Sequence, residues 1–491
     1  MVALGITESF EFLPEAIETH TSIVFLVGGR AYKFKKPLNL GFADFTSLQE
    51  RRRSCQNEIE LNRRLAPDVY LGMVDMVESG GIAVEHAVVM KRLPRLRQLS
   101  KLIEIGEDPL LFLRKVAKSM AALHGSAASE PKPDVRVSAD SLKERWETNL
   151  AELRRVPSME GFSDEIELMS RFSRNYLEGR RMLLSSRIQA GNIRDGHGDL
   201  RCDSIYCMED GPRIVDCLEF DDALRTQDVA CDVTFLAVDL EFAGKPELGR
   251  EFLRLYREMS GQTWPDSFTH LNMAYWAGVR AKVAAIREAQ TSSGLGAESA
   301  RWIEIAIGHL QEAEVALVLV GGVPGAGKST LAESLSEERG WLLLKSDDVR
   351  RDLAGVTRND HLPSPYGEGH YSSAATEATY QELLRRASEV VAMGQSVVMD
   401  ATWMQQAWRD SARLLAKDAN CRIIEIQCVA RRQIVDERIA ARKSIPSEMS
   451  DATVEISRKI GDEFESWSQA WVVDTEKSPA MNVKLALELI E

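Results

Sequence analysis

The stretch at residues 315–331, VALVLVGGVPGAGKSTL, restricts the possible folds of this 491-residue chain more than any other part of it. Its first residues, 315–320, are all apolar, which is typical of a strand buried on both faces of a parallel sheet. A glycine-rich loop follows and runs directly into helix-forming residues. Because loop N–H groups and a helix N-terminus together attract anions, the order strand, glycine loop, helix predicts a phosphate-binding loop.

The loop has the spacing Gly-x-x-x-x-Gly-Lys-Ser, from Gly322 to Ser329. In such a loop Lys328 would neutralise the β- and γ-phosphate oxygens of a nucleoside triphosphate, and the Ser329 hydroxyl would hold Mg²⁺. An ordinary glycine turn would account for the glycines, but not for a lysine and a hydroxyl between a strand and a helix. We therefore expect ATP and Mg²⁺ as cofactors. The expected nucleotide contacts are Gly322, Gly325, Ala326, Gly327, Lys328, Ser329 and Thr330.

Beyond this loop, apolar runs at residues 341–346, 395–400 and 421–428 alternate with helical patterns, which predicts a parallel sheet covered by helices. Ligands of such sheets bind at the carboxyl ends of the strands, where Asp347 and Asp400 are expected. We expect Asp400 to hold Mg²⁺ and Asp347 to accept the proton of an acceptor hydroxyl. Taken alone, each acid is also explained as a helix N-cap.

Three arginines follow the last of these runs. Arg431, Arg438 and Arg442 are spaced by seven and four residues, which would put them on one face of a helix. Arg438 and Arg442 are therefore candidates for closing over the transferring phosphates and stabilising transition-state charge. A solvated charged face explains the same spacing. Residues 367–380 are expected to contribute to an acceptor pocket because of their place in the chain.

The first hundred residues predict a small mixed lobe. Apolar or alternating runs at 22–27 and 31–35 are separated by Gly28 and Gly29, which indicates a β-hairpin. On its second strand Lys33 and Lys35 share one face. A helix over 47–65 and strands within 69–77 and 87–95 follow, and helical patterns dominate from 110 to 190.

Four residues of this half match the requirements of a phosphoryl-transfer site. Such a site needs a lysine on the phosphates, an acid that holds the lysine, a base near the acceptor and an acid on Mg²⁺. Lys33, Glu58, Asp199 and Asp216 occur in that order in the chain.

The segment His197-Gly198-Asp199-Leu200, followed by Ile214-Val215-Asp216, resembles the catalytic segment of aminoglycoside phosphotransferase-like kinases, which share the protein-kinase fold. The resemblance implies that Lys33 and Glu58 hold ATP, that Asp199 is the catalytic acid and that Asp216 binds the metal. It also implies an adenine-contacting hinge at Met90 and Leu93.

This sequence departs from that family in two ways. Ser204 stands where the family usually has a metal-binding asparagine, so metal binding would fall to a poorer ligand or recruit Asp203. No glycine-rich loop precedes Lys33. A non-catalytic module that senses a ligand and regulates the other half is therefore a second hypothesis.

The C-terminal part resembles small P-loop kinases of the polynucleotide kinase, gluconate kinase and zeta-toxin type through GVPGAGKST, SDDVRR and VVMDAT. That resemblance implies Asp347 as the base, Arg350 as a substrate contact, and Arg438 and Arg442 as lid residues. The whole chain resembles bacterial two-domain proteins that fuse an aminoglycoside phosphotransferase-like domain to a predicted P-loop kinase.

The expected fold class is therefore α/β and α+β: a protein-kinase-like bilobal domain followed by a P-loop NTPase domain whose parallel sheet is covered by helices. The predicted divisions are an N-lobe at 1–100, a helical C-lobe at 101–295, a connecting helix at 296–314 and a P-loop kinase domain at 315–491.

Composition restricts the partners. A formal net charge of −14 argues against a large nucleic-acid surface. Cysteines without a CxxC pair suit the reducing cytosol, and no apolar run is long enough to span a membrane. We expect a cytoplasmic kinase whose acceptor is a small hydroxyl compound, such as a sugar or an aminoglycoside-like molecule. A third hypothesis makes the P-loop half a nucleotide-hydrolysing switch. The sequence leaves the oligomeric state open.

Overall fold

The computed structural model describes residues 15–19, 21–39, 44–127, 137–291, 296–356, 369–442 and 453–490. The chain divides into two compact units. Unit 1 comprises Met1–Ile166, Ser186–Trp264 and Asn272–His309, and unit 2 comprises Glu167–Ser185, Pro265–Leu271 and Leu310–Glu491. The last change from unit 1 to unit 2 falls between His309 and Leu310, inside the segment 296–314. The two earlier helical segments, Glu167–Ser185 and Pro265–Leu271, also belong to unit 2. The divisions predicted at residues 100, 295 and 314 stay predictions.

Unit 1 begins with a five-stranded antiparallel sheet in the order β1-β2-β3-β5-β4. Its strands are β1 (Glu15–Glu18), β2 (Ser22–Val27), β3 (Arg30–Lys35), β4 (Tyr70–Val77) and β5 (Ala83–Lys91). The predicted hairpin is present as β2 and β3, joined at Gly28, whose φ of 54° favours glycine. Helix α1 (Leu48–Asn62) follows, and the Ser47 side chain caps its N-terminus by accepting from Glu50 N.

A small core fixes α1 against this sheet. Cys55 and Ile59 of α1 pack with Tyr70 and Val88 of the strands, and Val215 from later in the chain joins them. Residue 215 directly precedes Asp216. The same core that packs α1 on the sheet therefore brings Asp216 close to it.

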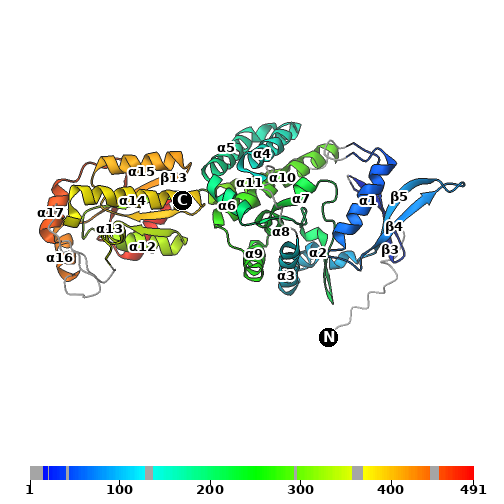
Figure 1. The fold of residues 1–491 in the computed structure, drawn as a ribbon, viewed down its shortest axis with the longest axis horizontal. Coiled ribbons are helices and arrows are strands. Elements are labelled where there is room, and N and C mark those ends of the chain that lie inside the picture. Colours follow the sequence, from blue (N-terminus) through cyan, green and yellow to red (C-terminus); the bar gives the residue numbers. More distant parts are fainter. Residues whose placement is uncertain are drawn as a thin grey trace. The chain divides into compact units, whose positions relative to one another are not determined.

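The rest of unit 1 is mainly helical (Figure 1). The α-helices between α1 and residue 313 are α2 (Leu99–Glu104), α3 (Leu110–Ser126), α4 (Ala139–Arg154), α5 (Ser163–Gly179), α6 (Arg181–Gln189), α7 (Asp222–Arg225), α8 (Val229–Phe242), α9 (Pro246–Ser260), α10 (Asp266–Thr291) and α11 (Ala297–Glu312). Parts of α5, α6, α10 and α11 belong to unit 2. Two antiparallel ribbons frame the predicted catalytic segment: β6 (Ile193–Asp195) with β9 (Thr226–Asp228), and β7 (Ile205–Met208) with β8 (Gly211–Ile214).

Unit 2 is built on a five-stranded parallel sheet in the order β11-β12-β10-β13-β14. The strands are β10 (Ala316–Gly321), β11 (Leu342–Lys345), β12 (Val397–Asp400), β13 (Arg422–Val429) and β14 (Trp471–Asp474). The helices are α12 (Lys328–Arg339), α13 (Ser346–Ala354), α14 (Ser373–Ala392), α15 (Gln406–Asp418), α16 (Arg432–Arg442), α17 (Val454–Asp462) and α18 (Pro479–Ile490). Strand β14 was not predicted.

Alternation along β10 explains how this sheet is covered on both faces. Val318 and Val320 join one core with Leu335 of α12 and Ile490 of α18. Leu317, which is fully buried, belongs to the opposite face, where Figure 1 shows α14 and α15. The predicted fold class, an antiparallel-sheet lobe with helices followed by a parallel sheet covered by helices, is confirmed. Among the described residues, none of the helices combines the length and the apolar character needed to cross a membrane.

Candidate functional site

The loop between β10 and α12 can be built only with glycines at its key positions. Gly322, Gly325 and Gly327 have φ angles of 134°, 85° and 89°. A Cβ at Gly322 would lie 2.4 Å from the carbonyl oxygen of Cys428, and a Cβ at Gly327 would lie 3.1 Å from the side chain of Thr475. Because both positions need positive φ and lack space, side chains there would force the loop away from β13 and β14.

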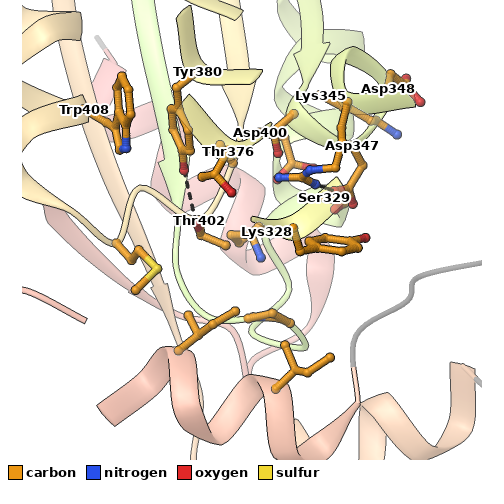
Figure 2. A pocket seen from close by; sticks show the side chains of 18 of the residues that line it. Lys328, Ser329, Lys345, Asp347, Asp348, Thr376, Tyr380, Asp400, Thr402 and Trp408 are labelled. Carbon is orange, nitrogen blue, oxygen red and sulfur yellow. Dashed lines mark hydrogen bonds and ion pairs between the residues drawn. The ribbon is translucent and has the colours of Figure 1, made fainter. Parts of the chain in front are cut away.

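This loop opens on a cavity of about 740 Å³. The predicted residues Lys328, Ser329, Asp347 and Asp400 all line it, and Figure 2 shows them on one side of the loop. Gly325 and Thr330 line it as well. The predicted convergence of strand ends on a single crevice is therefore what the structure contains. The ammonium group of Lys328 donates to the carbonyl oxygen of Val323 at 3.2 Å.

Asp400 supplies a buried acid at the end of β12. Only 6% of it is exposed. Burial raises the pKa of its carboxyl above the ordinary value of 3.8, although Lys328 and a hydrogen bond from Ser329 favour the ionised form. A carboxylate beside a hydroxyl offers the hard oxygen ligands that Mg²⁺ prefers, and a cation would offset the burial of the charge. Asp400 and Ser329 therefore fit a magnesium ion.

The predicted base and several aromatic rings also line the cavity. Asp347 lies in the first turn of α13, and Arg350 donates to its Oδ1 at 2.8 Å. The guanidinium of Arg350 lies 4.7 Å from the ring centre of Tyr371. Tyr380 stacks on Trp408, with ring centres 4.9 Å apart, and its hydroxyl lies 3.0 Å from the Thr402 hydroxyl.

These rings belong in part to the segment 367–380, which was expected to contribute to an acceptor pocket. Residues 367 and 368 lie outside the described part of the chain. Tyr371, Thr376 and Tyr380 line the cavity. Trp408 was not predicted, since a tryptophan in a helical pattern looks like an ordinary core residue in a sequence.

The arginines after β13 take different positions. Arg431 precedes α16 and pairs with Glu476. Arg438 donates to the hydroxyl of Thr475 at 3.0 Å, and that hydroxyl donates to the carbonyl oxygen of Ala326 at 2.7 Å. Arg438 is thus linked to the glycine loop and is absent from the described residues that line the cavity. The side chain of Arg442 lies outside the described part of the structure.

Unit 1 brings three of its predicted residues together. The ammonium group of Lys33 donates to Glu58 Oε1 at 2.8 Å and to Asp216 Oδ1 at 3.2 Å. Lys35, on the same face of β3, lies 2.7 Å from Glu58 Oε2 and also pairs with Glu219. The role of Lys35 as a second partner of Glu58 was not predicted, although its alternation with Lys33 was visible in the sequence.

The charges of this cluster depend on one another. Burial alone would raise the pKa of Glu58, but Lys33 and Lys35 outweigh it and lower this pKa to about 2. Burial alone would lower the pKa of Lys33, but Glu58 and Asp216 keep it well above its ordinary range. Both groups are therefore charged at neutral pH, which is the state needed to hold phosphate oxygens.

The predicted catalytic segment is anchored by Asp232 of α8. Its carboxylate accepts from the backbone N–H groups of His197 and Gly198, each at 2.8 Å, and lies 2.9 Å from His124 Nε2. Asp232 was not predicted, because an acid in an apolar helix gives no sign of its distant partners. Asp199, at the end of this segment, pairs with Arg201 through both carboxylate oxygens at 2.9 and 3.0 Å.

The remaining predicted residues of unit 1 lie around the same loop. The buried Ser204 hydroxyl donates to the carbonyl oxygen of Asp199 at 3.4 Å, and Asp203 accepts from Ser100 at 2.6 Å. Met90 and Leu93 pack against the core that contains Val215. The metal-binding and hinge roles of these residues stay predictions.

The fold and the glycine loop define unit 2 as a P-loop nucleotide-binding domain. Residues 317–465 match a family model described as an AAA domain. Over 460 residues, the whole chain is 39% identical to an uncharacterized protein of Mycobacterium tuberculosis, a match that covers 93% of this chain and 91% of that protein. A protein of Mycobacterium bovis matches equally well. The chain belongs to the same family as these mycobacterial proteins.

Two solved structures illustrate the backbone likeness of other proteins to parts of this chain. A choline kinase from Cryptosporidium parvum is 11% identical, with a TM-score of 0.41, and the match covers 63% of this chain and 91% of that one. A gluconokinase from Sinorhizobium meliloti is 18% identical, with a TM-score of 0.26, and the match covers 36% of this chain and 91% of that one.

Glu58→Gln is expected to lower the free energy of unfolding at pH 7 by about 3–5 kcal/mol, because it removes the charge that two buried lysines share. In the wild type the stabilisation by Glu58 is present above the ordinary pKa of 4.5 and is lost as the pH falls towards a pKa of about 2. The difference between the two proteins should therefore shrink over that range. Urea unfolding at several pH values measures this difference.

Glu50→Gln, an exposed change on the same helix, should alter stability by less than about 0.5 kcal/mol. Equal effects of the two substitutions would contradict the buried network.

Asp400→Asn is expected to raise the stability of the nucleotide-free protein at pH 7. Since burial raises the pKa of Asp400, the folded state binds its proton more tightly than the unfolded chain, and stability falls as the pH rises from 3.8 through the raised pKa. Asparagine cannot ionise, so the variant does not lose stability in this way as the pH rises. Thermal unfolding from about pH 4 to about pH 8 measures the effect, with the exposed Asp410→Asn on α15 as control. A less stable Asp400→Asn protein at pH 7 would refute this reading of the buried acid.

Proposed function

We propose that the protein is an ATP-dependent phosphotransferase with two nucleotide sites, each of which transfers the γ-phosphoryl group to a hydroxyl of a small molecule. The observation that carries the proposal for unit 2 is the shared cavity of Lys328, Ser329, Asp347 and Asp400. A nucleotide-hydrolysing switch would need the loop and the magnesium ligands. It would not need an exposed acid in a cavity with aromatic walls.

In unit 2 the residues divide the work of an in-line transfer. When bound, ATP supplies the phosphoryl group and Mg²⁺ neutralises charge on its phosphates. Lys328 holds phosphate oxygens, and Ser329 and Asp400 hold the metal. Asp347 accepts the proton of the acceptor hydroxyl, and Arg350 keeps the carboxylate of Asp347 oriented through their 2.8 Å contact. The rate enhancement then comes from positioning and charge stabilisation.

In unit 1 the cluster of Lys33, Glu58 and Asp216 supports a second site of the same chemistry. Lys33, which is held by Glu58, binds phosphate oxygens, and Asp216 holds the metal. Asp199 accepts the proton of the acceptor. Each of its oxygens has a lone pair besides the one that Arg201 occupies.

One observation favours a second candidate function for unit 1. Both oxygens of Asp199 are engaged by Arg201, which would suit a module that senses a ligand without transferring phosphate. The two candidates differ in whether Asp199 is needed for any transfer.

Phosphate transfer from ATP to sugars, aminoglycosides, nucleosides, hydroxy acids and sugar phosphates tests the proposal in the wild type, Lys328→Ala and Asp199→Ala. We expect each variant to lose at least about a hundredfold in transfer to one acceptor class while keeping the other. Lys417→Ala and Asp164→Ala, which change exposed residues of the same types, should keep both. If Asp199→Ala keeps all transfer and Lys328→Ala loses all of it, unit 1 is the sensing module. If the wild type only hydrolyses ATP, the kinase proposal fails for both units.

A further inference from the structure

Within the described part of the chain, the guanidinium of Arg280 on α10 has no carboxylate in direct contact with it. Its Nε is buried and lacks a hydrogen-bond partner, and across the described ranges of the chain no hydrogen bond or ion pair reaches its guanidinium. The ring of Trp302 lies over this guanidinium, with its centre 5.7 Å from Cζ. Arginine stays charged in proteins, and a largely buried charge is normally paired.

Packed contacts connect this guanidinium with the predicted catalytic segment. Trp302 stacks on Phe242 of α8, with ring centres 4.0 Å apart. One turn earlier on α8, Asp239 accepts from the backbone N–H of Cys202 at 2.8 Å. Cys202 directly follows Arg201, which pairs with Asp199. Arg280 therefore belongs to the structure around Asp199, and all these residues lie in unit 1.

The acids near Arg280 are engaged elsewhere. Asp199 is held by Arg201, Asp239 by the N–H of Cys202, and Glu298 by Arg287. Burial lowers the pKa of Arg280, and the positive charge of Arg201 lowers it further. The charges of these three acids raise it again, but they do not offset the burial. The charges of two guanidinium groups thus act on the carboxylate of Asp199, and of these two only Arg201 contacts it directly.

We propose that the acceptor at the Asp199 site is an anionic hydroxyl compound, whose carboxylate or phosphate group is bound by Arg280. The inference rests on the proposed function of unit 1 and names the acceptor class of that site. A planar guanidinium binds either anion through paired hydrogen bonds, and its charge disfavours cations such as aminoglycosides. In the transfer, the acceptor oxygen bonds to the γ-phosphorus as the bond to ADP breaks, and the hydroxyl proton passes to Asp199.

The test uses full-length Lys328→Ala protein, so that the P-loop site does not contribute, and compares glycerol 3-phosphate and glycerate with glycerol and choline. Calorimetry gives the Kd of each compound for this protein and for the same protein with Arg280→Gln or Arg254→Gln. Arg254 is an exposed arginine on α9 of the same unit. We expect an anionic compound to bind most tightly and to lose at least about tenfold in affinity with Arg280→Gln, with little change for Arg254→Gln. Arg280→Lys should restore part of the loss. The melting temperature of Arg280→Gln should be unchanged or higher, because an unpaired buried charge is removed.

Three results would overturn the inference. Neither anion binds, the Kd of the anion is unchanged by Arg280→Gln, or glycerol or choline binds more tightly than the anions. Transfer assays with the same compounds separate this inference from the proposed function. If an anion binds through Arg280 and receives no phosphate from ATP, the kinase function of unit 1 fails and the anion site stands. If glycerol or choline is phosphorylated equally well with Arg280→Gln, the kinase function stands and the anion site fails.

Discussion

The site in unit 2 depends on how closely the sheet approaches the loop between β10 and α12. Backbone of β13 and the Thr475 side chain occupy the space where side chains of Gly322 and Gly327 would lie. The loop is therefore held by the fit of its backbone, and Thr475, fixed by Arg438, bonds to it directly. With the loop fixed, the neighbouring strand β12 can place Asp400 beside Ser329, and β11 can deliver Asp347 to the same cavity.

Unit 1 depends instead on buried carboxylates that hold distant segments together. Glu58 joins α1 to two lysines of β3, and Asp232 joins α8 to the backbone of the predicted catalytic segment. Each acid is almost fully buried, so its ionised form persists only because several donors surround it. Rigid support of this kind fixes the positions of Lys33 and Asp199. Fixed positions matter here because phosphoryl transfer depends mainly on positioning and charge stabilisation, and little on covalent chemistry by the protein.

The parts predicted from the sequence are those with local signals. The glycine loop, the hairpin of β2 and β3, and the acids at the ends of β11 and β12 follow from spacing and from the rule that parallel strands end at one edge. The pairing of Lys33 with Glu58 came from a resemblance. Asp232, Lys35 and Trp408 act through partners far away in the sequence, and no local pattern names those partners. Arg280 stands out only through its burial in the fold. Strand β14 is short, with only four residues, and carries no motif.

Two nucleotide sites in one chain are the central claim, and the stoichiometry of binding tests it most directly. Equilibrium dialysis with a non-hydrolysable ATP analogue and Mg²⁺ should give two nucleotides per wild-type chain, and one for Lys328→Ala or for Lys33→Ala. A single nucleotide per wild-type chain, abolished by Lys328→Ala and unaffected by Lys33→Ala, would contradict the claim and leave unit 1 without a nucleotide site.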